Sequence, residues 1–160
     1  MSLLLDGTNG ITFNNATTQN SAGIVLQTTS GASSAAASTT STTYADTGIS
    51  VTITPKFATS KILILVDISG IQKSAFDSSG GFKAQRNGSD FWTINDFVCW
   101  NGAAQGNTSH IGAMYLDAPA TTSALTYKIQ YKSFSGSCTF GFNQSNSTTL
   151  STITVLEIAA

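Results

Sequence analysis

Charged side chains are scarce in this 160-residue sequence: they make up 9% of it, and the formal net charge is −1. In an average globular domain about a quarter of the residues are charged. Binding to nucleic acid or to an anionic lipid surface needs clustered basic residues, because attraction to phosphates supplies most of the affinity. The seven lysines and arginines are scattered along the chain. We therefore expect neither nucleic acid nor a charged membrane surface as a partner.

Long apolar runs are missing as well. A membrane-spanning helix needs about 20 consecutive apolar residues, and no stretch of the sequence reaches that length. The opening MSLLLDG contains three leucines, but it has no basic segment and too short an apolar core for a secretory signal. These features predict a protein without membrane insertion that folds in the cytoplasm, where it is made.

Cysteine and histidine are rare, with two cysteines and one histidine in the chain. Cys99 and Cys138 are far apart, so in a reducing cytoplasm we expect two buried thiols, with a disulfide as the alternative. One histidine and two distant cysteines do not form a recognisable zinc site. The acidic residues are dispersed singly. We predict no metal and no cofactor.

No motif of a catalytic site stands out. His110 lies in a predicted strand, and no G-x-S-x-G sequence frames a serine nucleophile. We therefore predict no catalytic residues and interpret His110 as a surface or interface residue of its strand. A hydrolase remains the less favoured alternative, and it would need acids that converge on His110.

What the sequence does contain is strand alternation. The segments ISVTIT (49–54) and LTYKIQYK (125–132) place apolar residues at every second position, which is typical of half-buried strands. The predicted inward side chains are Ile49, Val51, Ile53, Leu125, Tyr127, Ile129 and Tyr131. Asn87-Gly88 predicts a tight hairpin, because a type I′ turn needs two residues with positive φ.

Two other predicted strands are apolar on both faces. KILILVDI (61–68) is interpreted as a strand covered from two sides, either deep in the core or next to a subunit interface. STITVLEIA (151–159) is expected in the middle of a sheet, because an apolar strand is a liability at an open edge. Glu157 lies among its apolar residues, so we expect this carboxylate to reach a sheet margin or to pair with a lysine.

No segment shows helical spacing over three turns, and β-branched and aromatic residues dominate from Tyr44 onwards. About eight or nine strands with Gly, Asn and Ser turns predict an all-β protein, an antiparallel sandwich or barrel. A jelly-roll β-sandwich is the first choice and an immunoglobulin-like sandwich the second.

The first 43 residues have a different composition. No charged side chain occurs from Gly7 to Ala45, and SGASSAAASTTSTT offers almost nothing large enough to bury. Such a segment cannot offset the entropy cost of its own ordering. We therefore predict an extended N-terminal arm with a flexible linker at 28–43, and a sandwich domain over 44–160.

One stretch concentrates aromatic and polar side chains: SDFWTINDFVCWNG, residues 89–102. Aromatic faces beside carboxylates and amides can bind a sugar ring, through stacking and hydrogen bonds to its hydroxyls. The candidate ligand or receptor contacts are Phe91, Trp92, Asp96 and Trp100. The alternative is that these aromatics fill the core or a subunit interface.

Several phrases of the sequence together resemble a family of phage virion surface proteins. They are DTGISVTITPKFATSKILILVDISG, the RNG hairpin, YLDAPATTSALTYKIQYKS, the closing NQSNSTTLSTITVLEIAA and, before them, LDGTNGITFNNATTQNSAG. The family includes tail-fibre and head-decoration-like proteins of phages that infect marine bacteria and cyanobacteria. The resemblance implies a non-enzymatic structural protein with a jelly-roll sandwich, and a homotrimer. This chain lacks the long shaft of a typical tail fibre.

On this resemblance we expect residues 1–43 to attach the protein to other virion proteins, of the capsid, portal or tail. Residues 1–27 would be the attachment arm and 28–43 a tether to a knob on the virion surface, which contacts a host surface glycan. The alternative from another class is a carbohydrate-binding module, with its site at the Phe91–Trp100 cluster.

Overall fold

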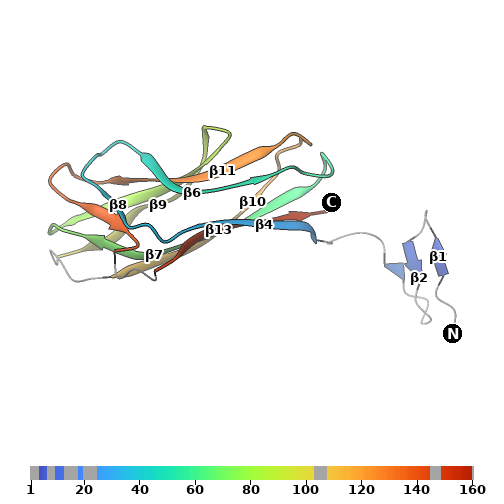
Figure 1. Ribbon diagram of the computed structural model, residues 1–160, viewed down its shortest axis with the longest axis horizontal. Coiled ribbons are helices and arrows are strands. Elements are labelled where there is room, and N and C mark those ends of the chain that lie inside the picture. Colours follow the sequence, from blue (N-terminus) through green and yellow to red (C-terminus); the bar gives the residue numbers. More distant parts are fainter. Residues whose placement is uncertain are drawn as a thin grey trace.

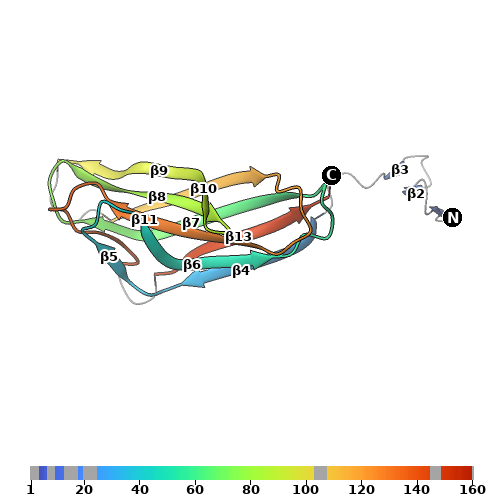
Figure 2. The same cartoon turned by 90° about the horizontal axis from the view of Figure 1, so that it is seen from above.

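The computed structural model describes residues 4–6, 10–12, 18–19, 25–102, 108–144 and 149–159, and in this part of the chain it contains strands but no helix. Two antiparallel sheets face each other and run along the long axis of the domain (Figure 1). The protein is therefore an all-β sandwich, as the alternation predicts. Viewed onto the sheets, β9 and β10 follow one side of the sandwich, and β4 and β6 the other (Figure 2).

The first sheet contains β4 (Val25–Ser33), β5 (Ala37–Thr39), β7 (Lys61–Lys73), β10 (Ser109–Asp117), β12 (Phe140–Phe142) and β13 (Ser151–Ile158). Its order is β4-β13-β7-β12-β5, and β10 also pairs with β7. The second sheet contains β6 (Ala45–Ile53), β8 (Ser78–Arg86), β9 (Ser89–Asn101) and β11 (Leu125–Ser133), in the order β6-β11-β8-β9. A separate small sheet is formed by β1 (Leu4–Asp6), β2 (Gly10–Thr12) and β3 (Thr18–Gln19).

The core lies between the inner faces of the two sheets. All seven side chains predicted to point inward are buried, each with at most 5% of its surface exposed. Phe82 of β8 packs against Phe140 and Phe142 of β12, with ring centroids 5.5 and 6.3 Å apart. Strand alternation with one buried face therefore explains most of this core.

The strand β13 lies inside the first sheet, between β4 and β7, which confirms the prediction for the last apolar segment. The strand β7 is only partly as predicted. Ile62, Ile64 and Ile68 are fully buried, but Leu65 on the opposite face is 37% exposed. The prediction that β7 is covered from two sides is therefore wrong within one chain, because nothing in the described part of the chain packs over that outer face as a further layer.

The predicted linker at 28–43 is also wrong, because most of it is sheet. Ser33 to Val25 of β4 pairs with Ser151 to Ile158 of β13, and Ala37–Thr39 of β5 pairs with β12. The sandwich therefore begins at Val25 and not at Tyr44. The remainder of the predicted arm, apart from β1, β2 and β3, lies outside the described residues.

Close packing explains why this edge strand is built from small residues. A Cβ atom at Gly31 of β4 would lie 1.8 Å from the backbone oxygen of Ser50 in β6. The two sheets approach each other so closely here that no side chain fits. Small residues that bury little surface themselves thus let β4 and β6 close one side of the sandwich.

The turn between β8 and β9 is the predicted one. Asn87 and Gly88 have φ of 51° and 83°, as a type I′ turn requires, and Arg86 pairs with Ser89. After the turn, β9 runs as one strand of 13 residues. Several shifts in its register with β8 mark β-bulges along it.

The carboxylate of Glu157 is fully buried and is satisfied by amide donors, not by the lysine ammonium that was one expected partner. Gln27 Nε2 donates to it at 2.6 Å, and the backbone N–H groups of Lys56 and Phe57 donate at 2.7 and 3.3 Å. Burial acts to raise the pKa of Glu157, but the nearby Ser60 hydroxyl together with these donors outweighs it, so the pKa lies below its ordinary value.

A second buried carboxylate connects the two sheets. Asp117 of β10 accepts hydrogen bonds from Arg86 of β8 and from the Tyr127 hydroxyl of β11, all at 2.7 Å. Burial, followed by this hydrogen bond to Asp117, raises the pKa of Tyr127, so the hydroxyl remains a donor. The contact holds the β10 edge of the first sheet against the second.

The close approach at Gly31 generates a prediction for stability. Gly31→Ala should destabilise the protein by about 1–3 kcal/mol, because the clash is with backbone and one of the sheets must shift. Gly136→Ala is the matched control, since a Cβ at Gly136 meets nothing within 4 Å. Urea denaturation of both variants measures the difference. Equal stability of Gly31→Ala and the control would contradict this account.

The buried carboxylate generates a prediction for pH. Because the pKa of Glu157 is lowered by folding, its contribution to stability is present above the unfolded value of about 4.3 and is lost as the pH falls through the folded value. Glu157→Gln should lower stability at pH 7 and give a flatter loss of stability below pH ~4 than the wild type. Denaturation midpoints between pH 2 and 7 test this, and parallel curves would show that Glu157 is not the group responsible.

Candidate functional site: an aromatic patch at the distal end

The two ends of the sandwich differ in what they present. At one end, which we name proximal, β4 begins and β13 ends (right in Figure 1). The Asn87-Gly88 turn lies beside the first residues of β11, where Asn87 donates its N–H to Thr126 O. At the opposite, distal end, β8 begins beside the last residue of β9, with Ser78 paired to Asn101. Phe134, directly after β11, donates its N–H to Ser79 O there. Any segment before Val25 therefore joins the sandwich at the end away from Phe134.

Three aromatic side chains form a cluster at the distal end, which we name the distal aromatic patch: Phe97, Trp100 and Phe134. Their ring centroids lie 5.1 Å (Phe97–Phe134), 5.8 Å (Trp100–Phe134) and 6.0 Å (Phe97–Trp100) apart. All three remain 45–56% exposed. Exposed rings that contact one another are unusual in an isolated domain and are typical of a binding surface.

Strand geometry explains the position of the patch on the outer face of the second sheet. On β11, inward Tyr131 alternates with outward Lys132, and the same alternation directs Phe134 outward. On β9 the bulges change the alternation, and the Asn95 side chain accepts the N–H of Phe97 at 2.8 Å. The local bond and the bulge together keep Phe97 outward, where it meets Phe134.

Polar side chains border the patch on the same face. The Tyr44 hydroxyl donates to Asp96 Oδ1 at 2.6 Å, and Lys132 Nζ lies 3.8 Å from the same oxygen. The ammonium groups of Lys83 and Lys132 lie 4.4 and 4.7 Å from the centroid of the Tyr44 ring, within cation–π distance. Burial, followed by the hydrogen bond to Asp96, raises the pKa of Tyr44 and keeps its hydroxyl protonated.

The four residues singled out by the sequence do not form one site. Asp96 and Trp100 lie at the distal aromatic patch and its polar border. Phe91 and Trp92 lie elsewhere, at the gap between β9 and β10: Trp92 stacks on Tyr115 at 5.3 Å, and Phe91 contacts Tyr127 at 5.7 Å. Both pack partly buried against the core and close that side of the sandwich. For these two, the alternative of core packing describes their surroundings better.

Sequence reasoning missed Phe134, Tyr44 and Lys132, which come from two other parts of the chain. The sheet pairing β11-β8-β9 brings Phe134 to the patch, and no local pattern reports that pairing. One signal was available. Counted from inward Tyr131, Phe134 falls on the outward side of its strand, where a phenylalanine is unusual.

His110 is exposed at the surface of β10, as expected, and its Nε2 lies 2.9 Å from Asp67 Oδ2. The hydroxyl of Ser69 donates to the other oxygen of Asp67 at 3.1 Å. In a catalytic triad the histidine lies between the serine and the acid. Here the acid lies between the serine and the histidine, so His110 is not placed to activate Ser69.

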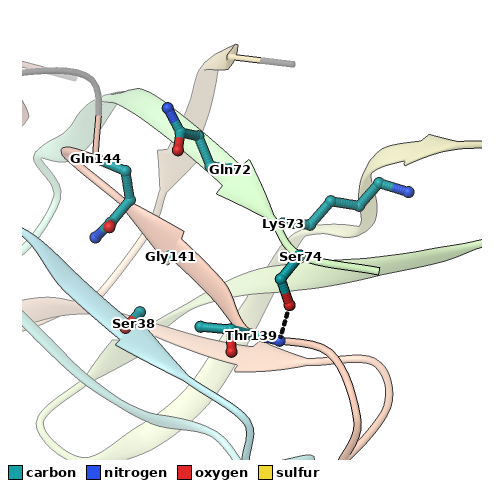
Figure 3. A pocket seen from close by; sticks show the side chains of 7 residues that line it. All are labelled: Ser38, Gln72, Lys73, Ser74, Thr139, Gly141 and Gln144. Atoms are coloured by element: carbon teal, nitrogen blue, oxygen red, sulfur yellow. Dashed lines mark hydrogen bonds between the residues drawn. The ribbon is translucent and has the colours of Figure 1, made fainter. Parts of the chain in front are cut away.

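A hollow lies on the outer face of the first sheet, also toward the distal end. Its lining residues are Ser38, Gln72, Lys73, Ser74, Thr139, Gly141 and Gln144 (Figure 3). Several of their polar groups already bond within the protein. Gln144 Nε2 donates to Ala37 O and Phe142 O at 3.1 Å, and Ser74 Oγ accepts the N–H of Thr139 at 2.8 Å. The Lys73 side chain extends away from both glutamines and donates to Ser78 O.

Metal and thiol chemistry find little support in the described part of the chain. It contains no group of three or more His, Cys, Asp or Glu residues that could hold a metal ion. Cys99 and Cys138 are free thiols, and Cys138 is buried as expected, whereas Cys99 is only half-buried. Among the same residues no helix is long and apolar enough to cross a bilayer.

Comparison with protein-family models and with curated proteins found no match for this chain. Function is therefore inferred from the residues of this chain and from the resemblance of its sequence segments to phage virion surface proteins.

Proposed function

We propose that this chain is a non-enzymatic structural protein of a phage virion, a short fibre or decoration protein on the particle surface. The N-terminal residues attach it to capsid, portal or tail proteins, and the sandwich is displayed as a knob that contacts the host surface. The observation that carries this proposal is that the two ends of the sandwich differ. The chain enters at the proximal end with β4, and the exposed aromatic patch lies at the distal end.

The strand order supports a jelly roll as the finer description of the sandwich. Counting β4–β5 and β12–β13 as one strand each, the two sheets of the sandwich contain eight strands, which we number in chain order. The first sheet then has the order first-eighth-third-sixth, and the second has second-seventh-fourth-fifth. Such an order arises when a long hairpin folds over into two Greek keys, as in viral capsid domains.

The outer faces of the two sheets support association with further copies of the chain, and the number of three copies follows from the resemblance. The second sheet carries three ion pairs on its outer face: Lys83–Asp90, Lys128–Asp46 and Lys132–Asp96. The first sheet presents exposed apolar side chains beside a pair of ionisable residues, Asp67 and His110. Met114 and Leu116 of β10 are 72% and 56% exposed and pair with Leu65 and Leu63 of β7.

We assign this apolar face to contacts with further copies of the chain. Removal of these apolar side chains from water favours the association of identical copies. The Asp67–His110 pair lies beside them on the same face and keeps its own partner. With the first sheet turned inward to its neighbours, the second sheet and the distal aromatic patch face outward. The same patch favours, as a second candidate, a carbohydrate-binding module that acts without a virion.

The attachment role predicts different effects for two deletions. Removal of residues 1–24 should leave a folded sandwich that no longer joins particles. Removal of 1–43 should also destabilise the fold, because β13 loses the β4 edge strand. Thermal denaturation measures the fold, and quantitative mass spectrometry of purified particles measures incorporation. If particles contain the 25–160 protein at the same level as the full chain, the attachment role is wrong. If the full chain is absent from particles, the virion assignment is wrong.

The homotrimer predicts the effect of charge on the apolar face. Leu116→Lys should reduce the native mass from three copies to one while the sandwich stays folded, because the ammonium cannot be desolvated in the interface. Thr126→Lys, at an exposed position of β11 in the second sheet, is the control and should stay trimeric. Native mass spectrometry reports the outcome. A wild-type monomer, or a trimer with Leu116→Lys, contradicts the assignment of this face.

A further inference from the structure

The geometry points to a ligand class for the distal aromatic patch: we infer that it binds one neutral pyranose ring of a polysaccharide, with Asp96 and Lys132 as hydrogen-bonding partners. The inference depends on the proposed function in one respect: the second sheet must face outward from the assembly, so that a ligand can reach it. The established features are the three exposed rings and the polar border on the same face of β9 and β11.

The arrangement of the rings sets the size of the ligand. Their planes are inclined by 47° (Phe97–Phe134), 73° (Phe97–Trp100) and 87° (Trp100–Phe134). Successive sugars or bases stacked in a row need aromatic faces that are roughly parallel, as in extended binding grooves. Here one ring supports the face of a ligand while the other two contact its edge. The patch therefore fits a single ring, not an extended stack.

The polar border lies at a suitable distance from the rings. Lys132 and Phe134 are two residues apart on the same face of β11, which corresponds to about 7 Å along a strand. A pyranose ring placed on the aromatic patch thus brings its hydroxyls to the row of Lys132 and Asp96. Both protein contacts of the Asp96 carboxylate are made to Oδ1. We assign Oδ2 as the acceptor for a sugar hydroxyl and the Lys132 ammonium as a donor.

The charges favour a neutral ring. Asp96 and Lys132 balance each other, and their side chains are 45% and 26% exposed. An anionic sugar would meet the Asp96 carboxylate at the position where a hydroxyl is needed. A purely apolar partner would remove water from Asp96 Oδ2 and from the Lys132 ammonium without replacing the hydrogen bonds that these groups lose. An uncharged sugar with several hydroxyls can both stack on the aromatic side chains and form hydrogen bonds with Asp96 and Lys132.

The hollow on the first sheet fits such a ligand less well. It contains no aromatic side chain, and the Gln144 amide and the Ser74 hydroxyl that line it already bond within the protein. Stacking would be absent and few hydrogen bonds would be gained there.

The test uses the full-length chain on an array of bacterial surface polysaccharide fragments that includes both neutral and uronic-acid sugars. Any binder is then titrated while tryptophan fluorescence is followed in a Trp92→Phe background, which leaves Trp100 as the only reporter. We expect saturable binding of neutral glycans. Phe134→Ala and Trp100→Ala should weaken binding at least ten-fold on the array, as truncation of a central aromatic contact does. Asp96→Asn should weaken it several-fold.

The control is Phe57→Ala. Phe57 is 56% exposed, as Phe97 is, but it lies in the loop after β6 at the proximal end, so its removal should leave binding unchanged. No saturable binding to any glycan, binding restricted to uronic acids, or equal loss in Phe57→Ala and Phe134→Ala would each overturn the inference. These outcomes are independent of particle incorporation: a protein that joins particles without binding sugar refutes this inference alone, and one that binds sugar but is absent from particles refutes the virion assignment alone.

Discussion

The structure depends on the face-to-face packing of two sheets whose inner sides are apolar. Every strand of the sandwich contributes to this contact or covers its margin, and most of the buried large side chains are isoleucine, phenylalanine and tyrosine from six of these strands. The free energy of the fold comes mainly from removing this surface from water. The two open sides of the sandwich then need closing. On one side, Phe91, Trp92 and Tyr115 fill the gap between β9 and β10. On the other, the absence of a side chain at Gly31 lets β4 and β6 meet.

The packing of the inner faces leaves the outer faces free to differ, and they do. The outer face of the second sheet carries three ion pairs and ends in exposed rings, whereas that of the first sheet carries leucine and methionine beside the Asp67–His110 pair. Three of the ion pairs thus lie on one side of the sandwich. In the arrangement that we propose, this division separates the surface used for assembly from the surface used for recognition.

Much of the fold could be predicted from the sequence, because strands with one buried face alternate visibly. Ile49, Val51 and Ile53 report their own orientation, and Asn87-Gly88 reports its own turn. The strand β4 could not be predicted in this way. Its small residues carry no apolar period, and what orders them is pairing with β13, more than a hundred residues later in the chain.

The same limit applies to the candidate site. The aromatic stretch at 89–102 was recognisable as unusual, but its members separate in space. Phe91 and Trp92 turn to the gap between the sheets, while Trp100 meets Phe134, a residue of another strand. Local sequence reports the kind of side chain, whereas the partners of a surface cluster depend on sheet order, which is a property of the whole chain.

The central position of β13 has a consequence for biosynthesis. Ser33 of β4 pairs with Ser151, so the edge strand has no partner in its sheet until translation has passed β13. At about 5–20 residues per second this delay is on the order of ten seconds. During that time the nascent chain holds an unpaired small-residue segment that aggregates poorly, while apolar β7 can pair with β10 as soon as both have emerged. The low apolar content of β4 thus limits aggregation of the strand whose partner in the sheet is synthesised last.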